Sequence, residues 1–420
     1  MKVNAIFGPP GTGKTRTLLS LASGKKALFL SFTKAAALEV RSRIPDNGAI
    51  TASTLHSLAF NKLGANRAQV VDSKKLVEFG KEAGIPFKGG EDGSDEIQEG
   101  DEYASVLSFA NNRIMPIRDA YNHFGCPGTL HRFEMYVEGY RSWKDTYGYM
   151  DFDDMLKVMT ERAPRLDVTD VFLDEAQDCS PLQWAALNSI LPADANVIIA
   201  GDDDQAIYEW NGADPHGMID FMQANEGEMR VLGRSYRVPR VVHELAHEVA
   251  LKNISRRVEK KFLPRDADGS VISYGDFYNI DPHSLTKGDG SMVLVRDRWR
   301  MEEVKRTFNR DLIPYAVMGG SSPWTSRIAN ELRDGKTPDI PLHWRDFYRM
   351  ADLSLPINIT LSTIHQAKGR EHSHVVLDLT LPTRTLAALY NDRDAELRVL
   401  YVALTRCSEK LTLCGSNPLL

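Results

Sequence analysis

A glycine-rich segment near the start of the chain carries the residue types that hold a triphosphate. Residues 8–15 read Gly8-Pro9-Pro10-Gly11-Thr12-Gly13-Lys14-Thr15 and match the pattern GxxxxGK[ST] at every position. Glycines let backbone N–H groups turn inward around phosphate oxygens, and the N-terminus of a following helix adds partial positive charge. We predict that Lys14 reaches the β- and γ-phosphates and that Thr15 offers its hydroxyl to Mg²⁺.

An acidic pair supplies the groups that hydrolysis of a triphosphate needs. The apolar run at residues 171–173 ends in Asp174 and Glu175, and ligands of open α/β sheets bind at the carboxyl ends of the strands. We expect Asp174 to hold the metal ion through water and Glu175 to act as general base on the attacking water. Arg237 and Arg406 suit stabilisation of the charge that develops on the γ-phosphoryl group, although their spacing alone also fits surface arginines.

Apolar runs and helical patterns alternate along the chain and predict the elements that position these residues. Buried strands are predicted at residues 3–7, 27–32, 171–173, 197–200, 292–295, 315–318, 357–361 and 374–377, and helices at 14–21, 35–43, 181–190, 240–251 and 394–404. Such alternation indicates a parallel sheet covered by helices on both faces. The series occurs twice, before and after about residue 234. Residues 64–146 interrupt it as a helical insertion with an acidic, Gly-rich surface loop at 89–96.

The composition is that of an ordinary globular protein. Apolar residues make up 42% and charged residues 26%, and the net charge of −6 argues against coating nucleic acid by positive charge alone. No apolar run reaches the roughly 18 residues that span a bilayer, and the first residues do not read as a signal peptide. The four cysteines form no CxxC pair, which indicates free thiols. We therefore expect a cytoplasmic protein that does not contact a membrane.

Further motifs follow the phosphate loop in one order across nearly the whole chain. They lie at residues 31–40, 51–57, 151–156, 201–210, 235–237, 363–371 and 396–406, on both sides of the acidic pair. This set resembles the motifs of the UvrD/Rep/PcrA group of superfamily 1 helicases. The resemblance implies ATP and Mg²⁺ as cofactors and single-stranded and partial duplex DNA as partners. It implies a 3′→5′ helicase or translocase of a bacterial or phage-infected cell, which we expect to be a monomer with an unknown loading protein.

The resemblance also implies a fold. We expect an α/β protein of two RecA-like P-loop NTPase domains, each a parallel sheet flanked by helices. The first would comprise residues 1–63 and 147–234, with 64–146 as a helical insertion, and the second would comprise 235–420. Fewer than about 40 residues remain where longer relatives have a second insertion domain, and a domain typically takes 50 or more. We therefore expect that domain to be absent or reduced to a loop.

Site residues are implied motif by motif. The catalytic set is Lys14, Asp174, Glu175, Gln205, Arg237 and Arg406, with Thr15 and Asp174 at the metal. The nucleotide-binding set is Gly8, Pro9, Pro10, Gly11, Thr12, Gly13, Lys14, Thr15, Arg16, Gly369 and Glu371. The DNA-binding set is Phe32, Thr33, Thr54, His56, Tyr208, Trp210, Thr363 and His365.

The resemblance implies that residues 201–210 couple hydrolysis to movement. Gln205 would sense the γ-phosphate, and Tyr208 and Trp210 follow it closely enough to move with it. A base stacked on an aromatic ring contributes about 1–3 kcal/mol and tolerates any sequence. A segment that shifts between two states would then change the grip on the strand in each cycle. The alternative for both aromatic residues is packing in the core.

Several positions depart from the family pattern. The glutamine-containing segment that reads adenine upstream of the phosphate loop is missing, which leaves the preference for ATP open. The usual Asn-Lys of the strand-side motif is Lys34-Ala35, the arginine expected after Trp210 is Asn211, and an aromatic position after Glu371 is occupied by His372.

Two other functions compete with the helicase hypothesis. A DNA-stimulated ATPase could remodel protein–DNA complexes without separating strands, because the second insertion domain is short. His243, Glu244 and His247 also spell HExxH, the pattern of a zinc protease. No third ligand pattern lies nearby and the segment directly follows the Arg237 motif, so we interpret these histidines as structural.

Overall fold

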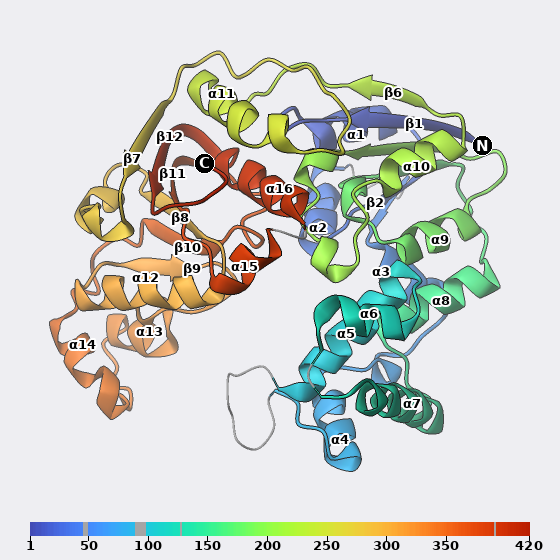
Figure 1. Ribbon diagram of the computed structural model, residues 1–420, viewed down its shortest axis with the longest axis horizontal. Coiled ribbons are helices and arrows are strands. Elements are labelled where there is room, and N and C mark those ends of the chain that lie inside the picture. The colour runs from blue at the N-terminus through green and yellow to red at the C-terminus, as the bar shows by residue number, and fades with distance from the viewer. Residues whose placement is uncertain (45–48, 89–97, 127, 390–391) are drawn as a thin grey trace. The chain divides into compact units, whose positions relative to one another are not determined.

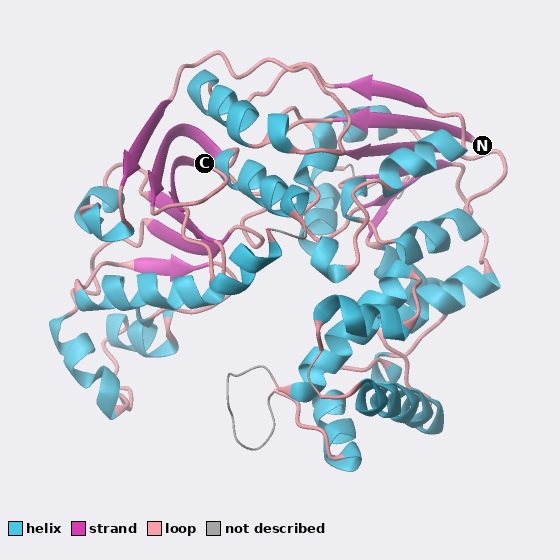
Figure 2. Ribbon diagram, in the orientation of Figure 1, coloured by secondary structure: helices cyan, strands magenta, loops and turns pink. Residues whose placement is uncertain are grey.

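The computed structural model describes residues 1–44, 49–88, 98–126, 128–389 and 392–420. The predicted surface loop at 89–96 lies outside this range. The chain divides into two compact units, one of Met1–Gly8 and Gly13–Leu232, the other of Pro9–Thr12 and Gly233–Leu420. Each unit holds a parallel sheet with helices packed against it (Figures 1 and 2). The predicted α/β class with two such sheets is confirmed.

The sheet of the first unit has the strand order β3-β2-β4-β5-β1-β6 among the described residues. Its strands are β1 (Lys2–Phe7), β2 (Ala27–Leu30), β3 (Ile50–Ser53), β4 (Asp170–Leu173), β5 (Asn196–Gly201) and β6 (Glu228–Val231). The helices beside it are α1 (Lys14–Ala22), α2 (Lys34–Arg43), α3 (Leu55–Lys62), α8 (Phe152–Arg162), α9 (Pro181–Ile190) and α10 (Gly217–Ala224). Large apolar side chains of the sheet and α1, among them Leu18, Phe29 and Phe172, form a buried cluster.

Strand register brings the predicted active-site segments to one edge of this sheet. Phe7 of β1 lies opposite Gly201 of β5, and Leu173 of β4 lies opposite Ile199. All these strands are parallel, so the residues that follow them emerge at the same edge. The phosphate loop, the Asp174–Glu175 pair and the segment that begins at Asp202 therefore start side by side.

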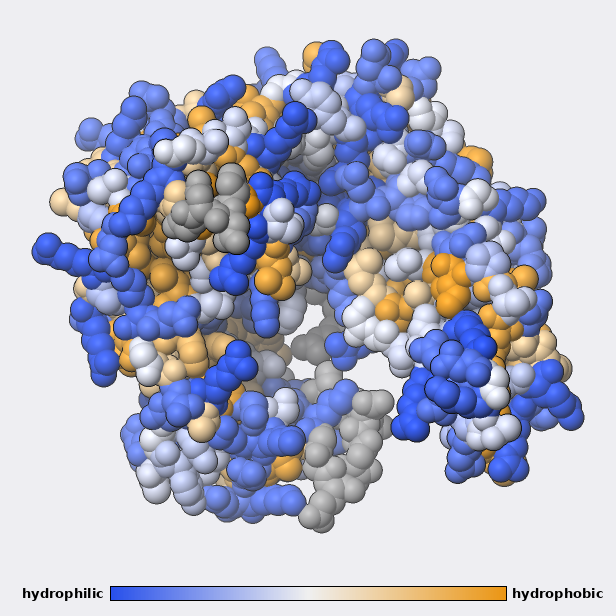
Figure 3. Space-filling model, turned by 180° about the vertical axis from the view of Figure 1, so that it is seen from behind, coloured by the Kyte–Doolittle hydropathy of each residue, from blue (hydrophilic) through white to orange (hydrophobic). Residues whose placement is uncertain are grey.

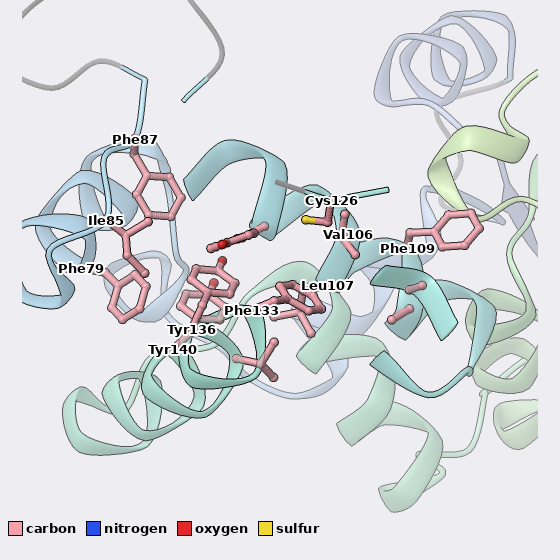
Figure 4. Close-up of a cluster of buried hydrophobic side chains, with 14 of the residues drawn as sticks. Phe79, Ile85, Phe87, Val106, Leu107, Phe109, Cys126, Phe133, Tyr136 and Tyr140 are labelled. Atoms are coloured by element: carbon pink, nitrogen blue, oxygen red, sulfur yellow. The ribbon is translucent and has the colours of Figure 1, made fainter. Parts of the chain in front are cut away.

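The described part of residues 64–146 is helical and has a core of its own. Its helices are α4 (Ser73–Ala83), α5 (Glu99–Arg113), α6 (Ile117–Phe124) and α7 (Leu130–Tyr147). Aromatic rings fill the space between them (Figure 4). Tyr136 contacts Tyr103 and Tyr140 at ring-centroid distances of 5.3 and 5.9 Å, and Phe79 lies 5.8 Å from Tyr136. Such packing holds the described helices of this segment together.

The sheet of the second unit has the strand order β7-β12-β11-β8-β10-β9 among the described residues. Its strands are β7 (Ser270–Tyr274), β8 (Ser291–Val295), β9 (Tyr315–Val317), β10 (Ile359–Thr363), β11 (His372–Asp378) and β12 (Cys407–Cys414). Its helices are α11 (Arg240–Val249), α12 (Arg298–Arg310), α13 (Arg327–Arg333), α14 (Arg345–Met350), α15 (Thr383–Ala388) and α16 (Arg393–Leu404).

The segment between β9 and β10 differs from the expected loop. It folds into α13 and α14, and Trp324 before α13 is fully buried. The ring of Trp324 meets Phe347 of α14 edge to face at 5.5 Å, and Trp344 meets the same ring at 5.4 Å. These aromatic contacts join the cluster beneath β8 and β10. The short segment is therefore a packed helical extension of the second sheet.

The surface drawn in Figure 3 is mostly hydrophilic, with hydrophobic side chains in small groups. In the described part of the chain, no helix combines the length and apolar character needed to cross a membrane.

Candidate active site and nucleic-acid interface

The phosphate loop joins β1 to α1 through two glycines in the left-handed region. Gly11 has φ +71° and Gly13, which precedes the first residue of α1, has φ +83°. Side chains other than glycine rarely adopt these angles, so the motif's glycines are required by the backbone. The Nζ of Lys14 donates to the carbonyl of Gly8 at 2.9 Å. The lysine thus curls back over the loop where phosphate oxygens are expected. Arg16, also predicted to bind nucleotide, is exposed on α1.

Thr15 and Asp174 meet as the metal hypothesis requires. The hydroxyl of Thr15 donates to Oδ2 of Asp174 at 2.5 Å, across 159 positions of sequence. Burial, followed by the neighbouring Glu175 carboxylate, raises the pKa of Asp174, because neither favours its charged form. A divalent cation would offset both effects. A hydroxyl and a carboxylate at the edge of a sheet are oxygen ligands of the kind that Mg²⁺ prefers, so these residues fit the metal.

Glu175 stands in an unusual backbone conformation. Its φ is +53°, and such a conformation costs about 1–3 kcal/mol for a residue other than glycine. The carboxylate has a side-chain partner, because Oε2 accepts a hydrogen bond from Nε2 of Gln177 at 2.6 Å. Strain of this kind gathers at functional sites, which supports the assignment of Glu175 as a reacting residue.

The predicted phosphate sensor, Gln205, lies in a buried turn after β5. Its Nε2 donates to Oδ2 of Asp202 at 2.7 Å, and its backbone N–H donates to the carbonyl of Asp202 at 2.8 Å. The residue is only 4% exposed. Asp202 therefore holds the Gln205 side chain.

The aromatic residues after Gln205 lead from this turn to the surface. Tyr208 stacks on Phe32 with ring centroids 5.4 Å apart and planes 26° from parallel. Trp210 lies 6.5 Å from Tyr208 and is 59% exposed. Core packing therefore does not account for Trp210, whereas Tyr208 and Phe32 are half-buried and support each other.

A groove of about 1120 Å³ in the first unit is lined in part by Phe32, the ring on which Tyr208 stacks. Phe32, Thr54 and His56 of the predicted DNA set line it, together with Asn211 and residues of the insertion and α8. Its cationic side chains are Lys34, Arg41 and Arg67, and its acidic ones are Asp72, Asp153 and Asp178. Lys34 and Arg67 are exposed. The groove thus combines three cationic and three acidic side chains with hydroxyls and aromatic rings.

Two hydroxyls of the predicted DNA set cap helices. The side chain of Thr33 accepts from the N–H of Ala36 at the start of α2, and that of Thr54 accepts from Ser57 at the start of α3. His56 is half-buried beside Phe152, at 5.7 Å edge to face. Burial lowers the pKa of His56 to about 4, so its imidazole is neutral at pH 7.

Four predicted residues of the second unit lie at the end of β10 or in the segment between β10 and β11. Thr363 ends β10, where its hydroxyl accepts from the N–H of Gln366 at 3.3 Å, and His365 lies in the turn that follows. Gly369 has φ +83° with open space around it. Glu371 pairs with Nε of Arg237. Two nucleotide-side predictions of the second unit, Glu371 and Arg237, are thus brought together by the fold.

Arg406 is buried. Only 1% of it is exposed, and its Nε donates to the carbonyl of Val402 at 2.9 Å while Nη1 reaches Arg370 at 3.4 Å. The residue follows α16 directly and leads into β12. Its guanidinium would have to exchange these backbone partners to contact a phosphate.

The HExxH segment lies on α11. His243 meets Phe262 edge to face at 4.6 Å, and His247 lies 3.5 Å from Glu248. Burial lowers the pKa of His243. Within the described residues, the one cluster of three ligand side chains close enough to share a metal ion is Asp202, Asp203 and Asp204, so the α11 histidines lack a third ligand. The structure gives the zinc-protease hypothesis no support.

Sequence reasoning overlooked Gln177 and Asn112. Gln177 is fully buried between the acidic pair and Asp202. Asn112 of α5 donates from Nδ2 to Asp153 at 2.9 Å and accepts from Ser180 at 2.8 Å, which ties the insertion to the groove wall. Gln177 lies two residues after Glu175, and an amide among carboxylates could have marked it in the sequence. No sequence pattern marks Asn112, because its partners Asp153 and Ser180 are remote in the chain.

Two parallel sheets, a phosphate loop after the first strand and a hydroxyl–carboxylate pair beside that loop are the features of the two-domain P-loop NTPase fold. The family model of the UvrD/REP helicase N-terminal domain matches residues 2–226, and that of the UvrD-like helicase C-terminal domain matches residues 358–414. The chain belongs to the UvrD/Rep helicase family. The resemblance read from the motifs is confirmed.

Individual relatives are distant. YjcD of Bacillus subtilis (strain 168) is 25% identical over 296 residues, which cover 62% of this chain and 38% of that protein. The ATP-dependent DNA helicase PcrA of Staphylococcus aureus (strain Mu50 / ATCC 700699) is 23% identical over 371 residues, which cover 78% of this chain and 50% of that protein. A crystal structure of Arterivirus nonstructural protein 10 (helicase) has a TM-score of 0.39 and 12% identity, covering 98% of this chain and 59% of that one. The chain spans half or less of the length of these curated relatives.

Proposed function

We propose that this protein is an ATP-driven DNA motor that hydrolyses ATP with Mg²⁺ and moves along single-stranded DNA, separating strands in the 3′→5′ direction. The observation that carries the proposal is the short path from Gln205 to Trp210. Gln205 is 4% exposed in the turn after β5, whereas Trp210, five residues further along the chain, is 59% exposed. A short segment therefore connects the proposed phosphate sensor to an exposed ring that can stack on bases.

Hydrolysis is assigned to residues at the edge of the first sheet. Lys14 and the phosphate-loop N–H groups would bind the triphosphate, and Thr15 with Asp174 would hold Mg²⁺, which neutralises charge on the β- and γ-phosphates. Glu175 would take a proton from the attacking water, because its carboxylate is held in place by Gln177. Arg237 and Arg406 would supply positive charge from the second unit, and Gly369 with Glu371 would complete the nucleotide site.

The DNA track is assigned to the groove of the first unit. Lys34, Arg41 and Arg67 would contact backbone phosphates, and Phe32, Tyr208 and Trp210 would meet bases. Thr33, Thr54 and His56 would provide polar contacts, joined by Thr363 and His365 in the second unit. Because phosphate contacts dominate such binding, affinity should fall as salt rises.

Tailed duplexes test the proposal directly. Unwinding and ATPase activity are measured on substrates that carry a 3′ or a 5′ single-stranded tail, with Lys14→Ala as the inactive reference. We expect single-stranded DNA to stimulate ATPase activity and only the 3′-tailed duplex to be unwound. Unwinding confined to the 5′-tailed duplex would overturn the polarity, and turnover indifferent to DNA would overturn the motor.

The short segment between β9 and β10 is the ground for a second candidate function. Only α13 and α14 lie there, packed on the sheet through Trp324 and Phe347. A motor with so small a second insertion could remodel protein–DNA complexes without separating strands. DNA-stimulated ATPase activity that leaves every duplex intact, yet displaces a protein bound to single-stranded DNA, would establish this alternative.

The cellular setting is proposed on narrower grounds. The free cysteines Cys126, Cys179, Cys407 and Cys414 are all buried, which suits a reducing compartment. We place the motor in the cytoplasm of a bacterial or phage-infected cell, acting as a monomer.

A further inference from the structure

Gln177 occupies the position between the candidate catalytic base and the phosphate-sensing turn. It lies in a short 3-10 turn, Ala176–Asp178, that follows Glu175, and it is 0% exposed. Its Nε2 donates to Oε2 of Glu175 at 2.6 Å and to Oδ2 of Asp178 at 3.3 Å. Its Oε1 accepts from the backbone N–H of Asp202 at 3.0 Å. Both ends of the amide are therefore bonded.

The orientation of this amide follows from its partners. The carboxylates of Glu175 and Asp178 accept hydrogen bonds, and the N–H of Asp202 can only donate. The NH₂ group must therefore face the two acids and the oxygen must face Asp202. No other side chain of this length offers two donors and an acceptor on one planar group. Glutamate would keep the acceptor and lose the donors, and leucine would lose both.

The end of β5 is shaped to admit the amide. A Cβ at Gly201 would lie 2.5 Å from Oε1 of Gln177, 2.7 Å from Sδ of Met218 and 3.2 Å from the backbone nitrogen of Gln177. Any side chain at Gly201 would therefore push the amide away from Asp202. This close approach is a second observation, independent of the hydrogen bonds, that links Gln177 to the start of the sensing turn.

The bonds continue from Asp202 to the sensor. Oδ2 of Asp202 accepts from Nε2 of Gln205 at 2.7 Å, and Oδ1 accepts from the N–H of Asp204 at 3.3 Å. Asp202 is itself 0% exposed. A continuous series of hydrogen bonds thus leads from the Glu175 carboxylate through Gln177 and Asp202 to Gln205. The two ends are separated by 30 residues of sequence but by only these intermediates in space.

We propose that Gln177 is a positioning residue that orients the Glu175 carboxylate and couples it to the Asp202–Gln205 turn, and so to the DNA-facing Trp210. When Gln205 moves, Asp202 shifts the side-chain amide of Gln177, and this amide orients the Glu175 carboxylate. DNA held at Trp210 then biases the orientation of Glu175, which makes hydrolysis depend on the strand. This inference rests on the proposed function and adds to it the route by which DNA stimulates turnover.

Two substitutions of similar size test the route. Gln177→Glu removes both donors and places a carboxylate beside Glu175, and Gln177→Leu removes all the bonds. The matched control is Gln69→Glu, because Gln69 is exposed and its Oε1 only accepts, from the N–H of Asn66 at 3.1 Å. A carboxylate can replace that acceptor. For each protein, kcat and KM for ATP are measured with Mg²⁺, with and without oligo-dT, alongside the melting temperature.

We expect both Gln177 variants to lose DNA-stimulated kcat by about 10- to 100-fold, because a small misplacement of a reacting group has effects of that size. KM for ATP should change little, and the ratio of stimulated to basal rate should fall toward one. The control should match the wild type. Folded Gln177 variants that keep the wild-type ratio, or that raise KM without lowering kcat, would overturn the inference.

Gly201→Ala covers the case in which the Gln177 variants do not fold. Its methyl group would displace the amide without removing it, so we expect the same loss of stimulation ratio. An unchanged ratio in Gly201→Ala would also overturn the inference. The proposed function is tested separately by the wild type and Lys14→Ala: an inactive wild type refutes both proposals, whereas an active wild type with intact Gln177 variants refutes only this one.

Discussion

Arg237 donates a hydrogen bond from its Nε to the carboxylate of Glu371, although 134 positions separate the two residues in the chain. The Arg237 side chain is 16% exposed and that of Glu371 is 55% exposed. The ion pair holds the guanidinium ready at a site where the motifs predict a nucleotide. Phosphate oxygens would compete with Glu371 for the same donors, because both are anionic acceptors that suit the guanidinium fork.

Replacement of Arg237 should therefore disable hydrolysis more than binding. We expect Arg237→Ala to lower kcat for DNA-stimulated ATPase activity by about 10³-fold, the effect typical of an arginine that stabilises phosphoryl transfer. Arg237→Lys should restore little, since an ammonium lacks the planar fork. Steady-state turnover and binding of a fluorescent ATP analogue measure the two effects. Arg240→Ala is the control, because Arg240 makes only an exposed contact of 3.5 Å with Asp268. Near wild-type turnover in Arg237→Ala would contradict the role.

Asp174→Asn should abolish Mg²⁺-dependent turnover. The substitution keeps the size of the side chain and removes the charge that the metal needs beside Thr15. We expect ATPase activity to fall by at least about 100-fold, with no recovery as Mg²⁺ is raised. Asp170→Asn is a matched control at the other end of β4, where the carboxylate pairs with Lys25 in a partly exposed ion pair. Asp170→Asn should retain activity. Equal losses in both variants would point to damage of the strand.

Trp210→Ala should separate basal from DNA-stimulated activity. The exposed ring is expected to stack on bases, so its removal should weaken binding of oligo-dT by about 1–3 kcal/mol. Basal ATPase activity should change much less, because the sensor Gln205 is held by Asp202. Trp299→Ala is the control, since Trp299 on α12 is 60% exposed but outside the groove. Fluorescence anisotropy measures the affinity for oligo-dT, and ATPase assays measure the basal and DNA-stimulated rates. Parallel losses of basal and stimulated rates in Trp210→Ala would count against stacking.

Two groove residues should differ in their response to salt. Lys34 is an exposed cation on the groove wall, so Lys34→Ala should lower the slope of log K against log salt by about 0.7 for single-stranded DNA. His56 is neutral at pH 7 because burial lowers its pKa to about 4. His56→Gln should therefore leave the slope unchanged, even if affinity falls. A slope that drops in His56→Gln would show that the imidazole carries charge when DNA is bound.

Much of the fold could be predicted because its central strands are continuous apolar runs. Those runs correspond to β1, β2, β4, β5, β8, β9, β10 and β11 in the structure. β6 and β7 were not predicted: they lie at sheet edges and are largely exposed, so they lack an apolar signal. β3 is only four residues long and half polar, and β12 alternates without a sustained apolar run.

The candidate site was predictable in residue type but not in conformation. Spacing identified Lys14, Thr15 and Asp174, and the structure brings Thr15 and Asp174 into contact. Spacing could not show that Arg406 is buried against Val402, because a side chain's partners depend on packing between distant segments. The same reason hid Gln177, whose role appears only once β4 and β5 are neighbours.

Asp153 should make stability depend on pH in a defined direction. This carboxylate of α8 accepts from Asn111 and Asn112, and burial together with Asp151 raises its pKa from 3.8 to about 6. The folded state thus binds a proton more tightly than the unfolded state. By linkage, the free energy of unfolding falls as pH rises from about 4 to about 6 and is level above that range. The full loss in the free energy of unfolding is up to about 3 kcal/mol, because each unit of pKa shift corresponds to about 1.36 kcal/mol.

Comparison with Asp153→Asn isolates this effect. Urea unfolding of both proteins between pH 5 and 7 should show the wild type losing roughly 1 kcal/mol relative to the variant as pH rises. His56 acts in the opposite sense, since its lowered pKa reduces stability as pH falls, but it is present in both proteins and cancels from the difference. If the Asp153→Asn difference does not change with pH, the buried carboxylate is ionised throughout, and its asparagine contacts must outweigh the burial that surrounds it.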